Sequence, residues 1–399
     1  MNRARLMLTS AICGITVVFA SGSSASTAAG AEMGGFGVLT PRQRNRVEAA
    51  VDKGLKFLAS QQQRDGSFRA PAAGQPGVTS LCVLAFLSRG HLPGQGPYGE
   101  TIERGIAFCR SAQRPDGLFS QNKPESTHRY LLASHAATYN HAITGLMLTE
   151  VYGMLPNDQP QQAVAFQGRF PAAAGPADLR VTIERAIQFS MLCHPQPKRF
   201  PNERGAWRYL RRYGLNDADL SITSWQVMFL RSARNAGFDI PARDIEQAVK
   251  YIKSCYDEKN TTFVYEIVEE EPELNRPRAM AGAGILALSL AGQHHTEMAQ
   301  KTGDWLLQRP FTQYDRPIRG ENWHVYSAFY SSQAMFQLGG EYWENYFPTF
   351  VDTVTAHQSR DGAWRPAGGL DRRYGEAYTT AMTVLALTPP YQLLPIFQR

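Results

Sequence analysis

Apolar residues recur at helical spacing along most of the chain. The first such stripe consists of Val47, Val51, Leu55 and Leu58, at positions i, i+4, i+8 and i+11. Polar and charged residues occupy most positions between them, so the segment would have one apolar face. The next apolar segment, 77–88, contains no charged residue. An amphipathic helix followed by a nearly uncharged one predicts an exposed helix that packs on a covered helix.

The same alternation occurs six times along the chain. The predicted helix pairs are 47–65 with 77–88, 100–113 with 138–155, 179–193 with 221–236, 242–255 with 277–291, 297–308 with 324–338, and 343–358 with 376–388. An open stack of such pairs needs polar capping repeats at both ends, and the sequence has no obvious ones. We therefore predict an all-α fold in which six helix pairs close into an (α/α)6 toroid, a double-walled helical barrel with the charge-poor helices inside.

A seven-residue pattern, Gln-x-x-Asp-Gly-x-aromatic, ends three of the predicted outer helices. Its copies are Gln62, Asp65, Gly66 and Phe68; Gln113, Asp116, Gly117 and Phe119; and Gln358, Asp361, Gly362 and Trp364. Asp-Gly supplies the residues that stop a helix and turn the chain, and the aromatic side chain can fold back as an anchor. Gly205-Ala206-Trp207 is a degenerate fourth copy. A repeated stop signal predicts a repeated structural unit.

The N-terminal residues have the pattern of a secretion signal. Arg3 and Arg5 precede an uncharged apolar stretch, and the small residues before Glu32 fit a cleavage site. An uncleaved membrane anchor is the alternative, although the apolar stretch is shorter than the roughly 20 residues that a span needs. We expect an exported protein, periplasmic or extracellular, with no membrane span in the mature chain.

These patterns divide the chain into three parts. Residues 1–31 would be the signal peptide, 32–46 an N-terminal linker, and 47–399 the toroid. Two long connections, at about 156–178 and 194–206, are predicted to be inserts in the toroid. Long connections in a compact domain are often functional or mobile, and tolerated surface insertions are the alternative.

The charge composition bears on whether the partner is a nucleic acid. Removal of the signal peptide leaves 39 basic and 35 acidic residues, which are scattered along the chain. Because no basic stripe is present, we expect no nucleic acid partner. Three of the remaining cysteines, Cys109, Cys193 and Cys255, lie late in predicted outer helices, where they would pack as apolar residues rather than form disulfides. The oligomeric state is not indicated.

The sequence resembles the terpenoid cyclase and protein prenyltransferase superfamily. The resemblance rests on the three Gln-to-aromatic patterns, on the sixfold helix pairing and on the stretch 333–340. It is similar in particular to proteins with the prenyltransferase and squalene oxidase repeat, and this implies a single α/α toroid. The superfamily includes cyclases, protein prenyltransferases and catalytically inert binding domains, so the resemblance does not choose an activity.

The sequence lacks the residues that zinc-dependent prenyl transfer and thioester chemistry use in this superfamily. Ser327 stands where the resemblance would place the zinc-binding His of the prenyltransferases, and no Asp-x-Cys sequence occurs. The Cys-Gly-Glu-Gln sequence of thioester domains is absent as well. The other histidines do not have the spacing of metal ligands. We therefore expect no metal and no cofactor.

One short acidic segment resembles the Asp-x-Asp-Asp motif of squalene-type cyclases. Asp217 and Asp219 match two of its positions, whereas Leu220 replaces the last Asp. The resemblance implies Asp219 as a proton donor and Asp217 as its electrostatic partner, because a desolvated carboxyl group beside another carboxylate stays protonated. The alternative is that Asp219 or Ser221 caps the helix that follows.

Aromatic residues cluster near the starts of the predicted inner helices. The candidates for the wall of a central cavity are Tyr139, His141, Trp225, Tyr326, Tyr330 and Tyr378. Such side chains could surround an isoprenoid ligand, or they could fill the centre of the barrel. His141 is the candidate for an imidazole in contact with a ligand, with a hydrogen-bonded core histidine as the alternative.

Three functions remain open at this point. The first is an exported binding or interaction module that takes an isoprenoid, a lipid or a protein partner at the mouth of the toroid. The alternative is an acid-catalysed terpene-cyclase-like enzyme with Asp219 as donor. A third possibility is a carbohydrate-active enzyme, which needs two carboxylates across the cavity; Glu150 and Glu376 are the few that the inner helices offer.

Overall fold

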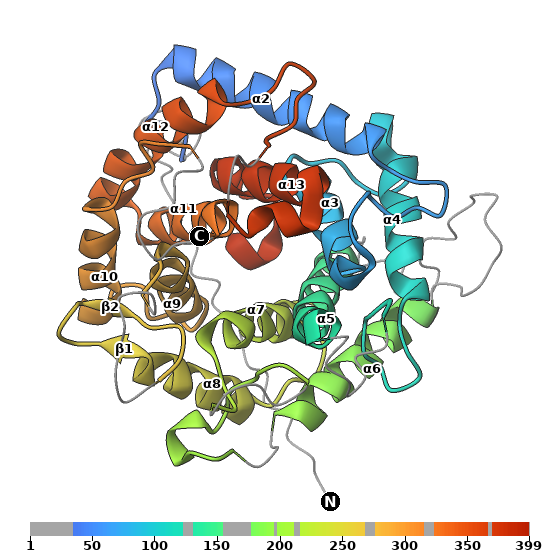
Figure 1. Cartoon of the computed structure of the whole chain (residues 1–399), viewed down its shortest axis with the longest axis vertical. Coiled ribbons are helices and arrows are strands. Elements are labelled where there is room, and N and C mark those ends of the chain that lie inside the picture. The colour runs from blue at the N-terminus through green and yellow to red at the C-terminus, as the bar shows by residue number, and fades with distance from the viewer. Residues whose placement is uncertain are drawn as a thin grey trace, which may run out of the picture. The chain divides into compact units, whose positions relative to one another are not determined.

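Twelve α-helices alternate between an outer and an inner ring in the described part of the chain (Figure 1). The computed structural model describes residues 35–122, 131–154, 177–194, 198–210, 216–267, 276–314, 323–365 and 369–398. The predicted signal peptide lies outside these ranges, as does most of the predicted insert 156–178. From Gly35 onward the described residues belong to one unit.

The two rings contain equal numbers of helices. The outer helices are α2 (Pro41–Ser60), α4 (Gly99–Ser111), α6 (Ala177–Cys193), α8 (Ala242–Ser254), α10 (Glu297–Leu307) and α12 (Gly340–Ala356). The inner helices are α3 (Gly77–Ser88), α5 (Leu131–Gly153), α7 (Leu220–Asn235), α9 (Arg278–Leu290), α11 (His324–Leu338) and α13 (Gly375–Leu387). A short antiparallel hairpin, β1 (Tyr256–Asp257) and β2 (Thr262–Phe263), follows α8.

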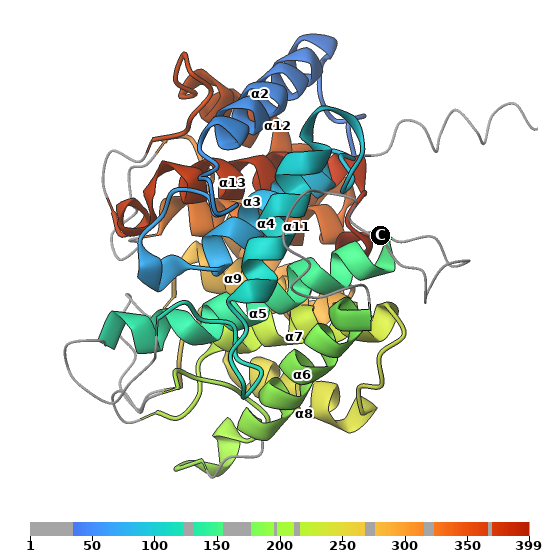
Figure 2. The same cartoon turned by 90° about the vertical axis from the view of Figure 1, so that its right-hand side faces the viewer.

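The inner ring is closed. Each inner helix contacts two inner neighbours, and the last one, α13, contacts both α3 and α2. A side view shows the inner helices running along the axis of the ring (Figure 2). Every residue of α3 is buried, and on α9 a Cβ at Gly282 would lie 2.6 Å from the carbonyl carbon of Tyr330 on α11. The predicted all-α toroid is confirmed.

Two helices start earlier than the sequence pattern predicts. Helix α2 begins at Pro41, where the Thr40 side chain accepts a hydrogen bond from the Gln43 amide in a capping box. Part of the expected linker 32–46 is therefore helical. Helix α5 begins at Leu131, so the second inner helix extends beyond its neighbours at one end of the ring.

The glutamines of the repeated pattern join successive outer helices. Each side-chain amide donates a 2.8 Å hydrogen bond to a backbone carbonyl of the next outer helix: Gln62 to Thr101, Gln113 to Thr182, and Gln358 to Ala50. The Gly of each copy has a positive φ between 90° and 95°, and a Cβ there would lie 2.3 Å from a carbonyl oxygen of that same helix. The pattern is therefore a structural contact between outer helices.

The aromatic residues of the pattern join the outer ring to the inner ring. Three of their backbone amides donate to threonine hydroxyls on inner helices: Phe68 to Thr79, Trp207 to Thr223, and Trp364 to Thr380, at 3.0–3.2 Å. In the second repeat the amide of Phe119 donates to Nδ1 of His141 at 3.3 Å. His141 thus occupies the position of the threonines.

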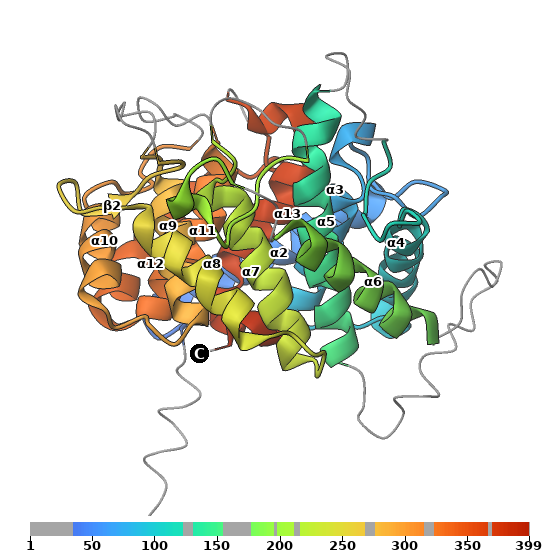
Figure 3. The same ribbon diagram turned by 90° about the horizontal axis from the view of Figure 1, so that it is seen from below.

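The C-terminal segment covers one end of the inner ring (Figure 3). Its two short helices are η7 (Pro389–Tyr391) and η8 (Pro395–Phe397). The Ile396 amide donates to Oε2 of Glu150, late in α5, at 3.2 Å. The Gln337 side chain, late in α11, donates to the Phe397 carbonyl at 2.9 Å. Both contacts lie near the C-terminal ends of inner helices, so we call this the closed end.

The described ranges bear on three further features: membrane-spanning helices, metal-ligand clusters and disulfides. In these ranges no helix is long and apolar enough to cross a membrane. Over the same residues, no group of three His, Cys, Asp or Glu side chains is placed to hold a metal ion. Among the described cysteines, Cys82, Cys109, Cys193 and Cys255, none forms a disulfide, and burial raises the pKa of Cys109 to about 12.

Candidate functional site

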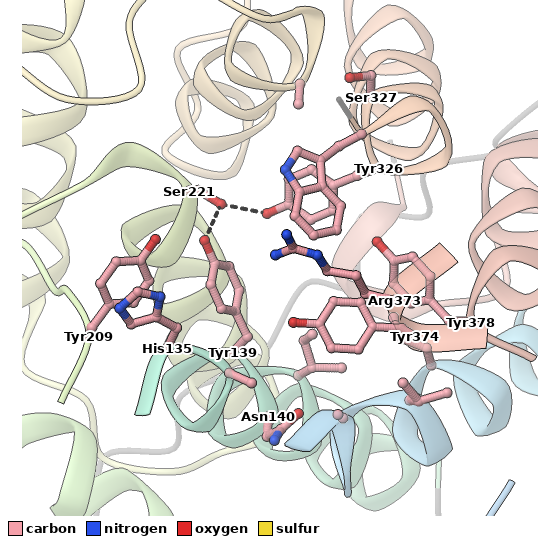
Figure 4. Close-up of a pocket in the computed structure, with 18 of the residues that line it drawn as sticks. His135, Tyr139, Asn140, Tyr209, Ser221, Tyr326, Ser327, Arg373, Tyr374 and Tyr378 are labelled. Carbon is pink, nitrogen blue, oxygen red and sulfur yellow. Dashed lines mark hydrogen bonds between the residues drawn. The ribbon is translucent and has the colours of Figure 1, made fainter. Parts of the chain in front are cut away.

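A cavity of about 350 Å³ lies at the N-terminal ends of the inner helices, which we call the mouth. Its floor is apolar and is formed by Val78, Leu81, Ile143 and Met280. Its wall is aromatic and contains Tyr139, Tyr209, Tyr265, Trp323, Tyr326, Tyr374 and Tyr378. Polar lining comes from His135, Asn140, Ser221, Ser327 and Arg373 (Figure 4). The mouth and the closed end are at opposite ends of the same helices.

A serine hydroxyl connects two tyrosines of the wall. The Ser221 Oγ lies 2.9 Å from the Tyr139 hydroxyl and 2.7 Å from the Tyr326 hydroxyl (Figure 4). The indole Nε1 of Trp225 donates to the same Tyr326 oxygen at 2.8 Å. These bonds join α5, α7 and α11 across the cavity wall and fix the direction of both phenol rings. Burial raises the pKa of Tyr139 and of Tyr326, so both phenols are neutral at physiological pH.

Three of the six predicted wall residues line the cavity, and three do not. Tyr139, Tyr326 and Tyr378 belong to the lining. Trp225 lies one helical turn after Ser221 and stacks on Phe329 in the core, with ring centroids 5.5 Å apart. The alternative interpretation, that aromatic side chains fill the barrel, therefore applies to Trp225.

The same correction applies to Tyr330 and His141. Tyr330 follows Tyr326 by one helical turn and is fully buried below it, with ring centroids 5.1 Å apart. His141 is two residues after Tyr139, a rotation of about 200° around the helix, so it faces the outer ring. Neither residue is part of the cavity lining.

His141 is a hydrogen-bonded core histidine. Besides the Phe119 amide at Nδ1, its Nε2 lies 3.1 Å from the Ala186 carbonyl and 3.0 Å from the Ser190 hydroxyl. These partners favour the tautomer with the proton on Nε2. Burial lowers the pKa of His141 to about 3, so the imidazole is neutral and joins the two rings.

Asp219 caps helix α7. Its Oδ1 accepts a 2.8 Å hydrogen bond from the Ile222 amide, the N-cap geometry that was the alternative interpretation of the acidic segment. Its Oδ2 lies 3.6 Å from Nη1 of Arg208. The carboxyl group is fully buried, and burial raises its pKa to about 6 although Arg208 and the Ile222 amide oppose that shift. Asp219 does not line the cavity.

Asp217 is not placed as an electrostatic partner inside the cavity. Its Oδ2 accepts a hydrogen bond from the Arg199 amide at 3.0 Å, and its own amide donates to Oε1 of Glu203 at 2.9 Å. Asp217 is half-buried beside the connection 198–210 and lies outside the cavity lining. The predicted pair of aspartates therefore does not meet across the cavity.

The two glutamates considered for carbohydrate chemistry each have a structural contact outside the cavity. Glu150 lies at the closed end, where it holds the C-terminal segment. Glu376 is at the start of α13 and pairs with Arg365 at 2.8 Å. Neither belongs to the lining residues that the structure describes, so the cavity lacks the paired carboxylates of that chemistry in its described part.

Sequence reasoning missed the rim of the mouth. Five of its residues lie before inner helices or in connections: Tyr209, Tyr265, Trp323, Arg373 and Tyr374. His135 lies in the first turns of α5, before the predicted start of that helix at residue 138. His135 stacks on Tyr209 with ring centroids 4.0 Å apart. The run Arg372-Arg373-Tyr374-Gly375, immediately before the sixth inner helix, is the signal that could have indicated the rim.

Among the described lining residues, Arg373 carries the positive charge of the mouth. Burial, together with the nearby Arg208, lowers the pKa of His135, so its imidazole is neutral at physiological pH. No aspartate or glutamate occurs among the lining residues in the described ranges. The cavity therefore combines an apolar floor, a wall of neutral phenols and one guanidinium at the rim.

Comparison with solved structures shows which known fold this chain resembles. No protein-family model matches the sequence, and no curated protein sequence matches it. The type II terpene cyclase MstE from Scytonema, in complex with merosterolic acid A (product), is similar with a TM-score of 0.53 and 13% identity, covering 88% of this chain and 100% of that one. The same cyclase with geranylgeranyl dihydroxybenzoate (substrate) gives 0.52 and 12%, covering 89% and 100%.

A further solved structure has the same fold and a different activity. An alpha-amylase from Clostridium perfringens is similar with a TM-score of 0.50 and 13% identity, covering 86% of this chain and 97% of that one. Proteins this distant share a backbone arrangement while their sites differ. The fold of this chain is therefore a terpene-cyclase-like α/α toroid, and its activity has to be argued from the residues of the cavity.

Proposed function

We propose that this chain binds an isoprenoid or similarly apolar ligand in the cavity at the mouth of its ring. The observation that carries the proposal is the lining itself: an apolar floor below a wall of seven aromatic residues. Apolar and aromatic side chains with a few fixed polar groups are the usual composition of small-molecule sites. The cavity volume of about 350 Å³ is at the small end of the range for such sites.

Two further features support a ligand rather than a filled core. The C-terminal segment covers the closed end, so a ligand would enter from the mouth and rest on the floor. The hydroxyls of Tyr139 and Tyr326 are held by Ser221 and do not need to reorganise when a ligand enters. One solved neighbour of the same fold is described in complex with geranylgeranyl dihydroxybenzoate, which has an isoprenoid chain.

The first experiment uses Trp323 as a reporter. It lines the cavity and is one of six tryptophans in the chain. Titration with farnesol, followed by calorimetry and by tryptophan emission, is expected to give saturable heat and a change in emission. In Trp323→Phe the heat should persist while most of the emission change disappears. Absence of saturable heat with farnesol and with geranylgeraniol would overturn the proposal.

A blocking variant tests the location. Ala279 is buried at the start of α9 and lines the cavity, so Ala279→Phe should fill the cavity and abolish binding. Ala291 lies at the other end of the same helix, outside the cavity, and Ala291→Phe is the matched control. Circular dichroism and thermal unfolding verify that both variants are folded. Undiminished binding by folded Ala279→Phe would place the ligand elsewhere.

A second candidate function is acid-catalysed cyclisation of an isoprenoid, favoured by the buried carboxyl group of Asp219. Its pKa of about 6 leaves part of the population protonated near neutral pH. Protonation of an alkene and later loss of a proton would isomerise the substrate without a cofactor. The position of Asp219 outside the cavity lining weighs against this role.

Asp219→Asn separates this second function from simple binding, because asparagine also caps helices. Squalene and geranylgeraniol, incubated with the protein and examined by gas chromatography and mass spectrometry, provide the assay. A cyclic product that is lost in folded Asp219→Asn would support the acid role. Undiminished turnover in this variant, or no product from the unaltered protein, would remove it.

We also propose that residues 1–31 direct export, because their charge and apolar pattern is that of a secretion signal. The protein recovered outside the cytoplasm should then begin at Glu32. N-terminal mass spectrometry of that material measures this directly. Recovery of the intact N-terminus in the membrane fraction would favour the anchor instead.

A further inference from the structure

The guanidinium of Arg373 is directed into the cavity rather than along the outer surface. Figure 4 shows it between the rings of Tyr139 and Tyr374, close to the side of the cavity where Tyr326 lies. Arg373 belongs to the short helix η6 (Asp371–Tyr374), which leads into α13. Arg372, its neighbour in the same short helix, is also exposed but is not part of the lining.

The short helix that carries Arg373 is anchored on both sides. The carboxylate of Asp371 is fully buried, and its Oδ2 accepts a hydrogen bond from the Val325 amide at the start of α11. The ring of Tyr374 packs between Trp323 and Tyr378, with centroids 6.2 and 5.4 Å away. The backbone of Arg373 is therefore fixed at the rim, while its side chain retains access to the cavity.

The described carboxylates near Arg373 have other partners: Asp371, in the same short helix, accepts from the Val325 amide. None of the ion pairs in the described ranges includes Arg373, and no carboxylate is among the described lining residues. The nearby Glu376 pairs with Arg365 instead. The wall contributes phenol hydroxyls, which bind anions as donors and carry no charge of their own.

We propose that the ligand of this cavity is an apolar chain with a single anionic head group, a carboxylate, that pairs with Arg373. The inference rests on the proposed function, since it names the chemical class of the same ligand. A guanidinium can donate two parallel hydrogen bonds to one carboxylate. The apolar chain then extends towards Val78, Leu81 and Met280 on the floor.

The charge of the mouth argues against a prenyl diphosphate. A diphosphate carries several negative charges, and proteins usually hold it with several cations or with Mg²⁺ that carboxylates bind. The described lining has one guanidinium, and no metal-binding group of His, Cys, Asp or Glu occurs among the described residues. The single charge of a carboxylate matches the single charge at the rim.

Three probes with the same chain test the assignment: farnesoic acid, methyl farnesoate and farnesyl diphosphate, each titrated into the protein at pH 7 and moderate salt. The acid should bind about tenfold or more tightly than the ester, because a charge-assisted hydrogen bond strengthens association by about that factor. In Arg373→Gln the affinity for the acid should fall to that for the ester, and the affinity for the ester should not change. Arg372→Gln, the matched control, should bind all three like the unaltered protein.

The outcomes separate this inference from the proposed function. If neither acid nor ester binds, the proposed apolar site is wrong. If the ester binds as well as the acid, or the diphosphate binds best, the site stands and the carboxylate assignment fails. Equal losses in Arg372→Gln and Arg373→Gln would assign the effect to general surface charge and overturn the role of Arg373.

Discussion

The two ends of the ring are built from the same inner helices, yet they hold polar groups in different ways. At the mouth, Ser221 at the start of α7 connects Tyr139 on α5 with Tyr326 on α11 beside an open cavity. At the closed end, Ser232, eleven residues later on the same helix, donates to the Glu150 carboxylate on α5 at 2.5 Å. Both serines join α5 to α7, and only Ser232 lies at the end that the C-terminal segment covers.

The two ends differ because the C-terminal segment covers only the closed end. The C-terminal segment buries Leu394, Ile396 and Phe397 over the helix ends, whereas the tyrosines at the mouth, except Tyr378, remain partly exposed. The repeated helix pairs thus form two similar ends. The short C-terminal segment, which lies outside the repeats, buries one of these ends as part of the core. The comparison indicates that stability is concentrated at the closed end and ligand contacts at the mouth, which is the usual separation of scaffold and site.

Removal of an aromatic side chain from each end should show the largest contrast. Phe397 is 5% exposed and packs against Phe329 with ring centroids 6.1 Å apart. We expect Phe397→Ala to lower the free energy of unfolding by about 3 kcal/mol or more, because a buried phenylalanine leaves a cavity. Tyr374→Ala, at the partly exposed rim, should cost about 1 kcal/mol. Urea unfolding measures both, and equal losses would contradict the comparison.

The pH dependence of stability should also come from the closed end. Burial raises the pKa of Glu150 to about 7 from its ordinary value of 4.5, although the Ser232 hydroxyl and the Ile396 amide oppose the shift. Since the folded pKa is the higher one, its stabilising effect is complete below pH 4.5 and is lost as the pH rises through 7. The corresponding fall in the free energy of unfolding is roughly 3 kcal/mol.

Glu150→Gln should therefore flatten that fall between pH 5 and 8, whatever its stability at a single pH. Glu376→Gln, in which a half-exposed carboxylate at the mouth end is replaced, is the control and should leave the slope unchanged. Chemical unfolding at a series of pH values provides the measurement. An unchanged slope in folded Glu150→Gln would show that this carboxyl group does not titrate in that range.

The fold was predictable from the sequence because it depends on repeated, local signals. The helix pairs follow from apolar spacing, and the Asp-Gly sequences mark the turns that follow the outer helices, which end five residues before each Asp. The glycine of the pattern has a structural reason, because in each copy it has a positive φ and lies against the next outer helix. Periodicity could not reveal that Gln62 and its counterparts bridge to the next outer helix, because that contact joins residues distant in sequence.

The cavity was predictable only in part because helix rotation decides which side chains face it. Tyr139 and His141 are two residues apart, and only the first faces inwards. Asp219 resembled a proton donor by its neighbours in sequence, but its hydrogen bond to Ile222 makes it a cap. Arg373 comes from a short helix outside the repeats, and no periodic signal points to it.

Replacement of the serine at the closed end should have a moderate effect. In Ser232→Ala the buried Glu150 carboxylate loses its 2.5 Å partner, while the Thr149 hydroxyl keeps the Leu146 carbonyl as an acceptor. We expect a loss of about 2 kcal/mol in the free energy of unfolding near neutral pH, because an ionised buried group is left with fewer hydrogen bonds. The loss should shrink at pH 5, where the carboxyl group is protonated. Urea unfolding at both pH values would reveal a constant loss, which contradicts this reasoning.

Replacement of the serine at the mouth should have the smallest effect on stability and a clearer one on binding. In Ser221→Ala the hydroxyls of Tyr139 and Tyr326 lose a shared partner, yet water from the open cavity can replace it. We expect a loss of about 0.5–1 kcal/mol in the free energy of unfolding. Farnesol binding should also weaken, because the Tyr139 hydroxyl loses its fixed partner while Tyr326 keeps the Trp225 indole. Urea unfolding and calorimetry on the same preparation give both values. A loss as large as that of Ser232→Ala would mean that the mouth is as tightly packed as the closed end, and a ligand would then have no preformed place to enter.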